Sequence, residues 1–189
     1  MNAIKQGKLR LRLRYIRPAF RTSARKLANA GVVNGFFYVA AVSGDYLPMR
    51  VWFDNQQWFL ERDLAEKALL AAWTRQQNTY YWTPFAKVYL KFYDREKLLK
   101  YSDPFPSGDS YTLYRGVQGE GDPHGVSWTT SLDIATHFAT DHNRFMGLGK
   151  IYRITVPRAD VYARIHESGR EEHEMLLVLD KDMPLERIS

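Results

Sequence analysis

The sequence of 189 residues contains no cysteine, which excludes disulfide bonds, thiolate metal sites and a cysteine nucleophile. It also lacks a long apolar run: the longest, residues 35–42, is far shorter than the ~18 residues of a membrane-spanning helix. There is no phosphate-binding P-loop and no strand–GxGxxG–helix unit, which argues against a Rossmann-type nucleotide domain. We therefore expect no membrane contact. The lack of cysteine does not by itself identify the compartment, and the location that we expect is the cytoplasm of the producing cell or of a target cell.

Metal-ligand patterns are missing as well. No pair of histidines has the His-Glu-x-x-His spacing that places two ligands on one helical face, so no metal site is expected. The histidines are His124, His137, His142, His166 and His173.

Acidic residues are missing from the first thirty residues, which carry nine Lys and Arg. The net charge of +6 originates there, because the remainder holds 18 basic and 21 acidic side chains. This segment lacks the apolar stretch of ~7–15 residues that a secretory signal requires. Three interpretations stay open: a solvated or core-edge segment, a contact with nucleic acid or an acidic partner, and a targeting segment.

In the N-terminal half the pattern predicts both strands and helices. Strict alternation of apolar and basic residues favours a strand at 9–15, and Gly31 and Asp63 are the expected end and start of helices. Expected strands span 9–15, 36–42 and 49–53, and expected helices span 22–30, 64–77 and 83–100. Four aromatic residues at helical spacing in the last helix are expected to face the core, with a base-stacking platform as the alternative, namely Phe85, Tyr89, Phe92 and Tyr93.

After a Pro/Gly/Ser-rich break at 103–110 the pattern changes to short strands. We expect a basic and helical region at 1–104, packed on a core at 105–189. Expected strands span 111–117, 126–130, 150–156, 161–165, 174–179 and 185–188, with a helix at 133–140. The fold class is therefore α+β, with a mostly antiparallel sheet.

Three polar segments stand out on these strands. Arg115 is expected mid-strand, where a guanidinium suits a bidentate clamp on an anionic group, and Gly116 lets a ligand or backbone approach closely. A structural arginine paired with nearby acids explains the same residue. Four hydroxyls follow at Ser127, Thr129, Thr130 and Ser131, which suit a sugar or cap the next helix.

The third segment is Glu172-His173-Glu174. On a strand, Glu172 and Glu174 would share one face, and their repulsion would raise one pKa unless a cation or a ligand hydroxyl intervenes. Taken alone, such a pair also suits a solvated strand edge.

The order of these segments resembles the Arg–Ser–Glu class of mono-ADP-ribosyltransferases over residues 110–180. The matching motifs are Arg115, Thr129-Thr130-Ser131, Ala135-Thr136-His137-Phe138 and Glu172-His173-Glu174-Met175-Leu176-Leu177. Thr129 stands where the family has its first serine, and Ser127 is a competing assignment. The resemblance implies split, mostly antiparallel sheets around an NAD cleft, with an N-terminal helical layer.

The resemblance also implies roles. Arg115 would hold the phosphate and ribose region of NAD+, Thr129 or Ser127 would orient Glu174, and Glu174 would engage the nicotinamide-ribose 2′-hydroxyl. Glu172 would orient or deprotonate the acceptor, and Gly116, Ser131, Tyr114 and Phe138 would complete the NAD+ site. Segments 165–171 and 140–149 occupy the places of the acceptor loop and the phosphate–nicotinamide loop, and Phe145 is a further candidate for ring stacking.

The expected activity is thus transfer of ADP-ribose from NAD+, used as a substrate without a metal, to a macromolecule. A protein arginine is slightly favoured over nucleic acid. Small bacterial and phage relatives of this kind act as toxins or effectors in conflict and defence, and the resemblance suggests an inhibitory partner or antitoxin. Two alternatives stay open: a nucleic-acid-binding module with structural carboxylates, and an NAD+ glycohydrolase.

Overall fold

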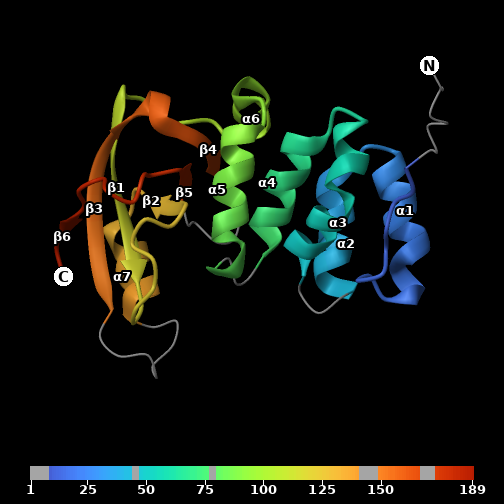
Figure 1. Ribbon diagram of the computed structural model, residues 1–189, viewed down its shortest axis with the longest axis horizontal. Coiled ribbons are helices and arrows are strands. Elements are labelled where there is room, and N and C mark those ends of the chain that lie inside the picture. The colour runs from blue at the N-terminus through green and yellow to red at the C-terminus, as the bar shows by residue number, and fades with distance from the viewer. Residues whose placement is uncertain (1–8, 44–46, 77–79, 141–148, 167–172) are drawn as a thin grey trace, which may run out of the picture. The chain divides into compact units, whose positions relative to one another are not determined.

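The computed structural model describes residues 9–43, 47–76, 80–140, 149–166 and 173–189. Within them the chain is α+β, with seven α-helices and one six-stranded antiparallel sheet, which confirms the expected class. It divides into two compact units, residues 1–79 and 80–189 (Figure 1). The sequence-based boundary lies later, after residue 104, so the segment predicted as one helix at 83–100 belongs to the unit with the sheet.

The first unit is helical. Its α-helices are α1 (Arg21–Asn29), α2 (Val33–Ser43), α3 (Pro48–Leu60) and α4 (Ala65–Arg75). Helix α1 and its end at Gly31, which has φ +70°, confirm the expected helix at 22–30. Asp63 is not the cap of α4: Leu64 takes that position, and Asp63 adopts φ +57°, a left-handed conformation that Asp tolerates.

Helix α2 occupies the segment predicted as a strand at 36–42, so that prediction is wrong. The buried residues of α2 stand at i, i+3, i+4, i+7 and i+8, the spacing of a helix face, and packing on that face outweighs local β-propensity. They are Val33, Phe36, Phe37, Ala40 and Ala41. The rings of Phe36 and Phe37 lie 5.8 and 5.7 Å from that of Phe59 in α3.

Helix α3 replaces the predicted return strand at 49–53. Pro48 stands in its first turn, where a missing N–H costs little, and Met49, Trp52 and Phe59 are fully buried on its inner face. The return-strand prediction depended on the strand at 36–42, and both fail together.

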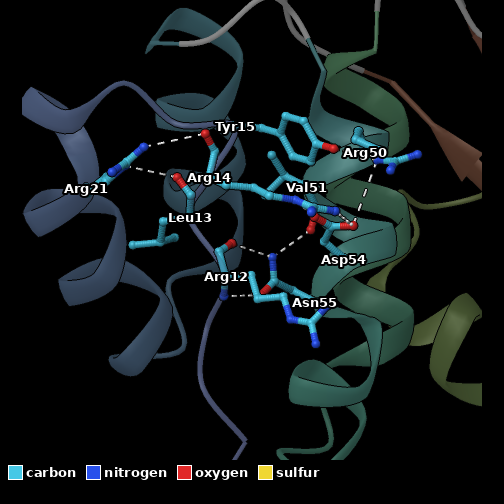
Figure 2. Close-up of polar contacts among 9 residues, drawn as sticks. All are labelled: Arg12, Leu13, Arg14, Tyr15, Arg21, Arg50, Val51, Asp54 and Asn55. Carbon is cyan, nitrogen blue, oxygen red and sulfur yellow. Dashed lines mark hydrogen bonds and ion pairs between the residues drawn. The ribbon is translucent and has the colours of Figure 1, made fainter.

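Residues 9–15 do not form the predicted strand. The backbone of Arg12 is instead held by one side chain, that of Asn55 on α3 (Figure 2). The Arg12 N–H donates to Asn55 Oδ1 at 2.6 Å, and Asn55 Nδ2 donates to the Arg12 carbonyl at 2.8 Å. Of the alternating apolar residues Leu13 is buried but Leu9 is 37% exposed, so the alternation does not mark one buried face.

The second unit begins with two helices where one was predicted at 83–100. Helices α5 (Thr83–Phe92) and α6 (Arg95–Tyr101) are separated by Asp94, whose side chain accepts hydrogen bonds from the N–H groups of Glu96 and Lys97. The expected core-facing aromatic stripe is wrong in part. Ala86 and Leu90 form the buried face of α5 with Tyr93, whereas Phe85 and Phe92 are 43% and 71% exposed.

The sheet has the order β4-β5-β2-β1-β3-β6, with every pair antiparallel. The strands are β1 (Ser110–Val117), β2 (Ser127–Thr129), β3 (Lys150–Pro157), β4 (Val161–Ile165), β5 (Glu174–Leu177) and β6 (Glu186–Arg187). The expected split into separate sheets is replaced by one continuous order. Strands β1 and β2 pair at a single register position, whereas β1 and β3 pair at eight, so the sheet has its shortest pairing between β1 and β2.

Apolar side chains cover both faces of this sheet. On one face Leu113, Trp128 and Met175 form a core with residues from the ends of β3, β4 and β5. On the other, helix α7 (Leu132–Thr140) lies against β1 and β3, with Ala135 and Ala139 packed on Ile151 (Figure 1). Because successive side chains of a strand point to opposite faces, neighbouring residues of β1, β2 and β5 lie alternately on the face of this core and on the face of α7.

Candidate functional site

Arg115 lies on β1 at the seam where β1 and β2 separate. Its Nη1 donates to the Ser127 carbonyl at 2.7 Å and its Nε to the Asp122 carbonyl at 3.3 Å. Burial lowers the pKa of Arg115 below the ordinary arginine value, and the nearby carboxylates of Asp122 and Glu174 oppose that effect. Because arginine stays protonated in proteins, the residue is a fixed positive charge at the seam.

Glu174 is the first residue of β5 and is half-buried. The Ser127 hydroxyl donates to its Oε1 at 2.5 Å, a short distance typical of a hydrogen bond to a charged acceptor. Ser127 therefore holds the carboxylate with its hydroxyl and Arg115 with its carbonyl. The structure brings these three residues together from segments far apart in the sequence, because β5, β2 and β1 are consecutive in the sheet order.

Thr129, the other candidate for the serine position, is buried on β2 opposite Glu174 in the register. Its Oγ1 accepts a hydrogen bond from the Ser131 N–H at 3.1 Å. Ser131 in turn accepts from the N–H of Ile134 at 3.3 Å, at the start of α7. We assign the serine position to Ser127, because its hydroxyl donates to Glu174 at 2.5 Å.

Tyr114, Gly116 and Phe138 lie around helix α7. Tyr114 packs with the cluster of α7 and Ile151, on the sheet face opposite to that of the Arg115 side chain. Gly116 lies so close to α7 that a Cβ there would overlap the Ala135 carbonyl oxygen. Phe138 is half-buried on α7, in edge contact with His137. Gly116 thus permits close packing of a helix, the second of the two uses expected for it.

Glu172 lies outside the described residues, as do Phe145 and most of the two expected loops. His173, which is described, has φ +46° and precedes the strand, so the strand rule that placed Glu172 and Glu174 on one face does not apply across it. The rings of His166 and His173 stack with centroids 4.8 Å apart.

The loop after β1 supplies two further residues that no sequence motif marks, Asp122 and Gly125. Burial alone would raise the pKa of Asp122, but a hydrogen bond from the His124 N–H at 2.9 Å and the Lys87 ammonium at 3.3 Å outweigh it, so this pKa is lowered. A Cβ on Gly125 would overlap the guanidinium of Arg115. The roles of Asp122 and Gly125 depend on contacts with residues distant in the sequence, so no local motif could have indicated them.

The lowered pKa of Asp122 predicts a pH-dependent contribution to stability. A depressed carboxyl pKa stabilises the fold above the ordinary value of about 4, and the contribution is lost as pH falls through the folded-state pKa. At pH 6 we expect the free energy of unfolding of wild type to be higher than that of Asp122→Asn by less than about 1 kcal/mol, since the ion pair of Asp122 with Lys87 is exposed. This difference should vanish towards pH 3. Urea unfolding across this range measures it, and a difference that grows on acidification would contradict the assignment.

An open hollow of about 860 Å³ in the second unit lies elsewhere. It is lined by residues of α6 and of the segments around β1 and β3, such as Arg95, Leu99, Phe105 and Arg158. It contains none of Arg115, Ser127 and Glu174. Because these three form a connected polar group and the hollow does not, we place the candidate site at the seam.

Within the described part of the chain, no group of three or more His, Asp or Glu residues is arranged to hold a metal ion. In the same part, none of the helices has the length and apolar character needed to cross a membrane. No family model, no curated protein and no solved structure matches this chain.

Proposed function

We propose that the second unit is the catalytic part of a mono-ADP-ribosyltransferase that uses NAD+ as its substrate. The observation that carries the proposal is the 2.5 Å contact between the Ser127 hydroxyl and Glu174, with Arg115 bound to the carbonyl of the same serine. Arginine, serine and glutamate from three separate segments thereby meet on neighbouring strands, in the order of the family motif.

The chemistry of this group fits the proposed substrate. Arg115 uses two of its five N–H donors on carbonyl oxygens, which fixes the plane of the guanidinium and leaves further donors for a phosphate oxygen. Asp122 and Glu174 lie close enough to favour its charge but leave it without a direct ion pair. A diphosphate–ribose ligand meets both a cation and a hydrogen-bond acceptor here.

In the proposed reaction the bond between nicotinamide and ribose C1′ breaks, with its electron pair leaving on nicotinamide, and C1′ bonds to an acceptor atom that loses a proton. Glu174, held by Ser127, accepts a hydrogen bond from the ribose 2′-hydroxyl and stabilises the positive charge that develops on the ribose. In this proposal Ser127 takes the role of the family's first serine, and Glu172 takes the acceptor proton.

The acceptor we propose is a macromolecule, with a protein arginine favoured by the glutamate at position 172 under the family resemblance. We further propose that the protein works in the cytoplasm as a toxin or effector and is restrained by an inhibitory partner.

The test is incubation of the purified chain with NAD+ labelled in its adenylate portion and a cell lysate, followed by digestion of parallel aliquots with protease or nuclease. We expect label in macromolecules that one of the two digestions releases. Free ADP-ribose without labelled macromolecule would indicate a glycohydrolase instead. Neither transfer nor nicotinamide release, from folded protein offered lysates of several species, would overturn the proposal.

Gly125→Ala tests the role of Arg115 without touching the polar residues. Because the added methyl group meets the end of a flexible side chain, we expect the fold to be kept and the guanidinium to be displaced. The transfer rate should fall about tenfold, the effect of roughly 1.4 kcal/mol lost from the transition state. If the variant acts through Arg115, combining it with Arg115→Lys should add little to the loss from Arg115→Lys alone. Additive losses, or an unchanged rate for Gly125→Ala, would contradict this role.

A further inference from the structure

The two units differ in charge. The first unit, residues 1–79, contains 13 Lys and Arg and five Asp and Glu, a net charge of +8. The second unit contains 14 and 16, a net charge of −2. The positive charge of the chain is thus a property of one folded unit, not of a mixed surface.

Among the described residues, the one ion pair between an acid of the first unit and its N-terminal part is that of Asp54 with Arg14. Asp54 accepts two hydrogen bonds from Arg14, at 2.7 and 2.9 Å, and lies 3.8 Å from Arg50 (Figure 2). Glu66 is buried, and Glu61 lies 3.9 Å from Arg62, beyond the end of α3. Five exposed basic residues then form no hydrogen bond or ion pair through their side chains within the described residues. This set, the basic N-terminal surface, is Arg10, Arg12, Arg17, Arg25 and Lys26.

Side-chain hydrogen bonds hold part of the backbone under this surface, at residues 12, 13 and 16. Asn55 holds the Arg12 backbone at both its N–H and its carbonyl. Arg21 donates from its Nε to the Leu13 carbonyl at 3.1 Å (Figure 2). The same Nε donates to the Ile16 carbonyl at 2.8 Å. A partner that binds here orders arginine side chains but not the chain that carries them, which lowers the entropic cost of binding.

The composition of the surface indicates the partner. Four of its five members are arginines, whose planar guanidinium binds phosphate oxygens in pairs and stacks on bases, whereas an anionic lipid surface attracts Lys and Arg alike. Phe20, 40% exposed between Arg17 and Arg21, adds a ring that can stack on a base. Nucleic acid, in which phosphates alternate with bases along the strand, suits this combination of arginines and an exposed ring.

We propose that the basic N-terminal surface binds the phosphate backbone of nucleic acid without reading its sequence. The proposal is independent of the proposed transferase activity, since it concerns another unit and needs no NAD+. If both hold, the acceptor is nucleic acid itself or a protein bound to it.

The test is fluorescence anisotropy of the full-length chain with labelled single-stranded RNA, single-stranded DNA and duplex DNA of one sequence, at several salt concentrations. The variant replaces Arg10, Arg12, Arg17 and Arg25 with Gln. Each phosphate contact contributes about −0.9 to the slope of log K against log salt on duplex DNA and about −0.7 on single strands. We expect the variant to bind at least tenfold more weakly, with a slope flatter by about 3.

The control pair has equal charge change. Arg12→Gln/Arg17→Gln should weaken binding severalfold, whereas Lys150→Gln/Lys181→Gln in the second unit should leave it within a factor of two. All variants should keep the wild-type melting temperature, because within the described residues these side chains form no hydrogen bond or ion pair.

Equal affinity of the quadruple variant and wild type would overturn the proposal, as would binding to phosphatidylserine vesicles with none to any oligonucleotide. Measured in Glu174→Gln as well, nucleic-acid binding should be unchanged. Loss of transfer with intact nucleic-acid binding in Glu174→Gln would show that the two activities are separate. Absence of nucleic-acid binding with intact transfer would overturn the binding proposal and leave the transferase proposal standing.

Discussion

Glu174→Gln is expected to lower the rate of ADP-ribose transfer about 100-fold or more, with the fold unchanged. The substitution keeps the shape of the side chain and an oxygen that can accept the Ser127 hydroxyl, so the contact at the seam remains. What it removes is the negative charge that would face the positive charge developing on the ribose. Loss of one fixed electrostatic group of this kind typically costs about 10²–10³ in rate, or roughly 3–4 kcal/mol.

The measurement is the initial rate of label transfer from NAD+ at saturating acceptor, together with the melting temperature. Glu120→Gln is the matched control, since Glu120 is exposed in the same unit and belongs to the loop after β1. It should retain the wild-type rate. If Glu174→Gln retained more than about a tenth of the rate, Glu174 would be a structural carboxylate.

Gly116→Ala is expected to destabilise the second unit by about 3 kcal/mol, or to prevent its folding. A Cβ at this position would overlap the Ala135 carbonyl and approach the Ala139 N–H to 2.7 Å, and both are backbone atoms of α7. Neither can turn aside as a side chain would, so α7 must move away from β1. Overpacking of this kind typically costs about 1–3 kcal/mol, and a backbone neighbour places the cost at the upper end.

Urea or thermal unfolding of the full-length chain, followed by a probe in the second unit such as Trp128 fluorescence, measures this effect. Gly35→Ala is the matched control, because its added methyl would meet only side-chain atoms of Val32 and Leu27, at 3.2 Å and beyond. Its position inside α2 favours alanine by about 0.5–1 kcal/mol, so this variant should be neutral or stabilising. A stable Gly116→Ala protein would mean that α7 is not tightly docked.

The second unit could be predicted from sequence far better than the first. Strands β1, β3 and β4 each carry a clear apolar alternation between turn residues, and each was expected within about two residues of its observed ends. In the first unit the same signals misled. The aromatic and β-branched residues of α2 favour a strand locally, and the helical spacing of Phe36, Phe37 and Ala40 becomes decisive once a helical partner is present.

The candidate site shows the same limit at smaller scale. Arg115, Ser127 and Glu174 were selected from sequence because each is polar within a strand. That the Ser127 hydroxyl would meet the carboxylate could not be predicted, since this depends on a diagonal contact across the β2–β5 register. Gly125 carries no local signal, because its role is set by a guanidinium ten residues away in sequence.

The hydrogen bonds between Asn55 and the Arg12 backbone also bear on self-association of the chain. An alternating apolar and basic segment is the kind of sequence that adds itself to an open sheet edge. Here the backbone of Arg12 is already satisfied by an amide side chain, and Leu13 is buried. The Asn55 side chain thus forms the backbone hydrogen bonds that a neighbouring strand would form. The arginines of the Arg12 segment also repel the like charges of a second copy of the chain. The same residues that attract a polyanion therefore protect the segment against self-association.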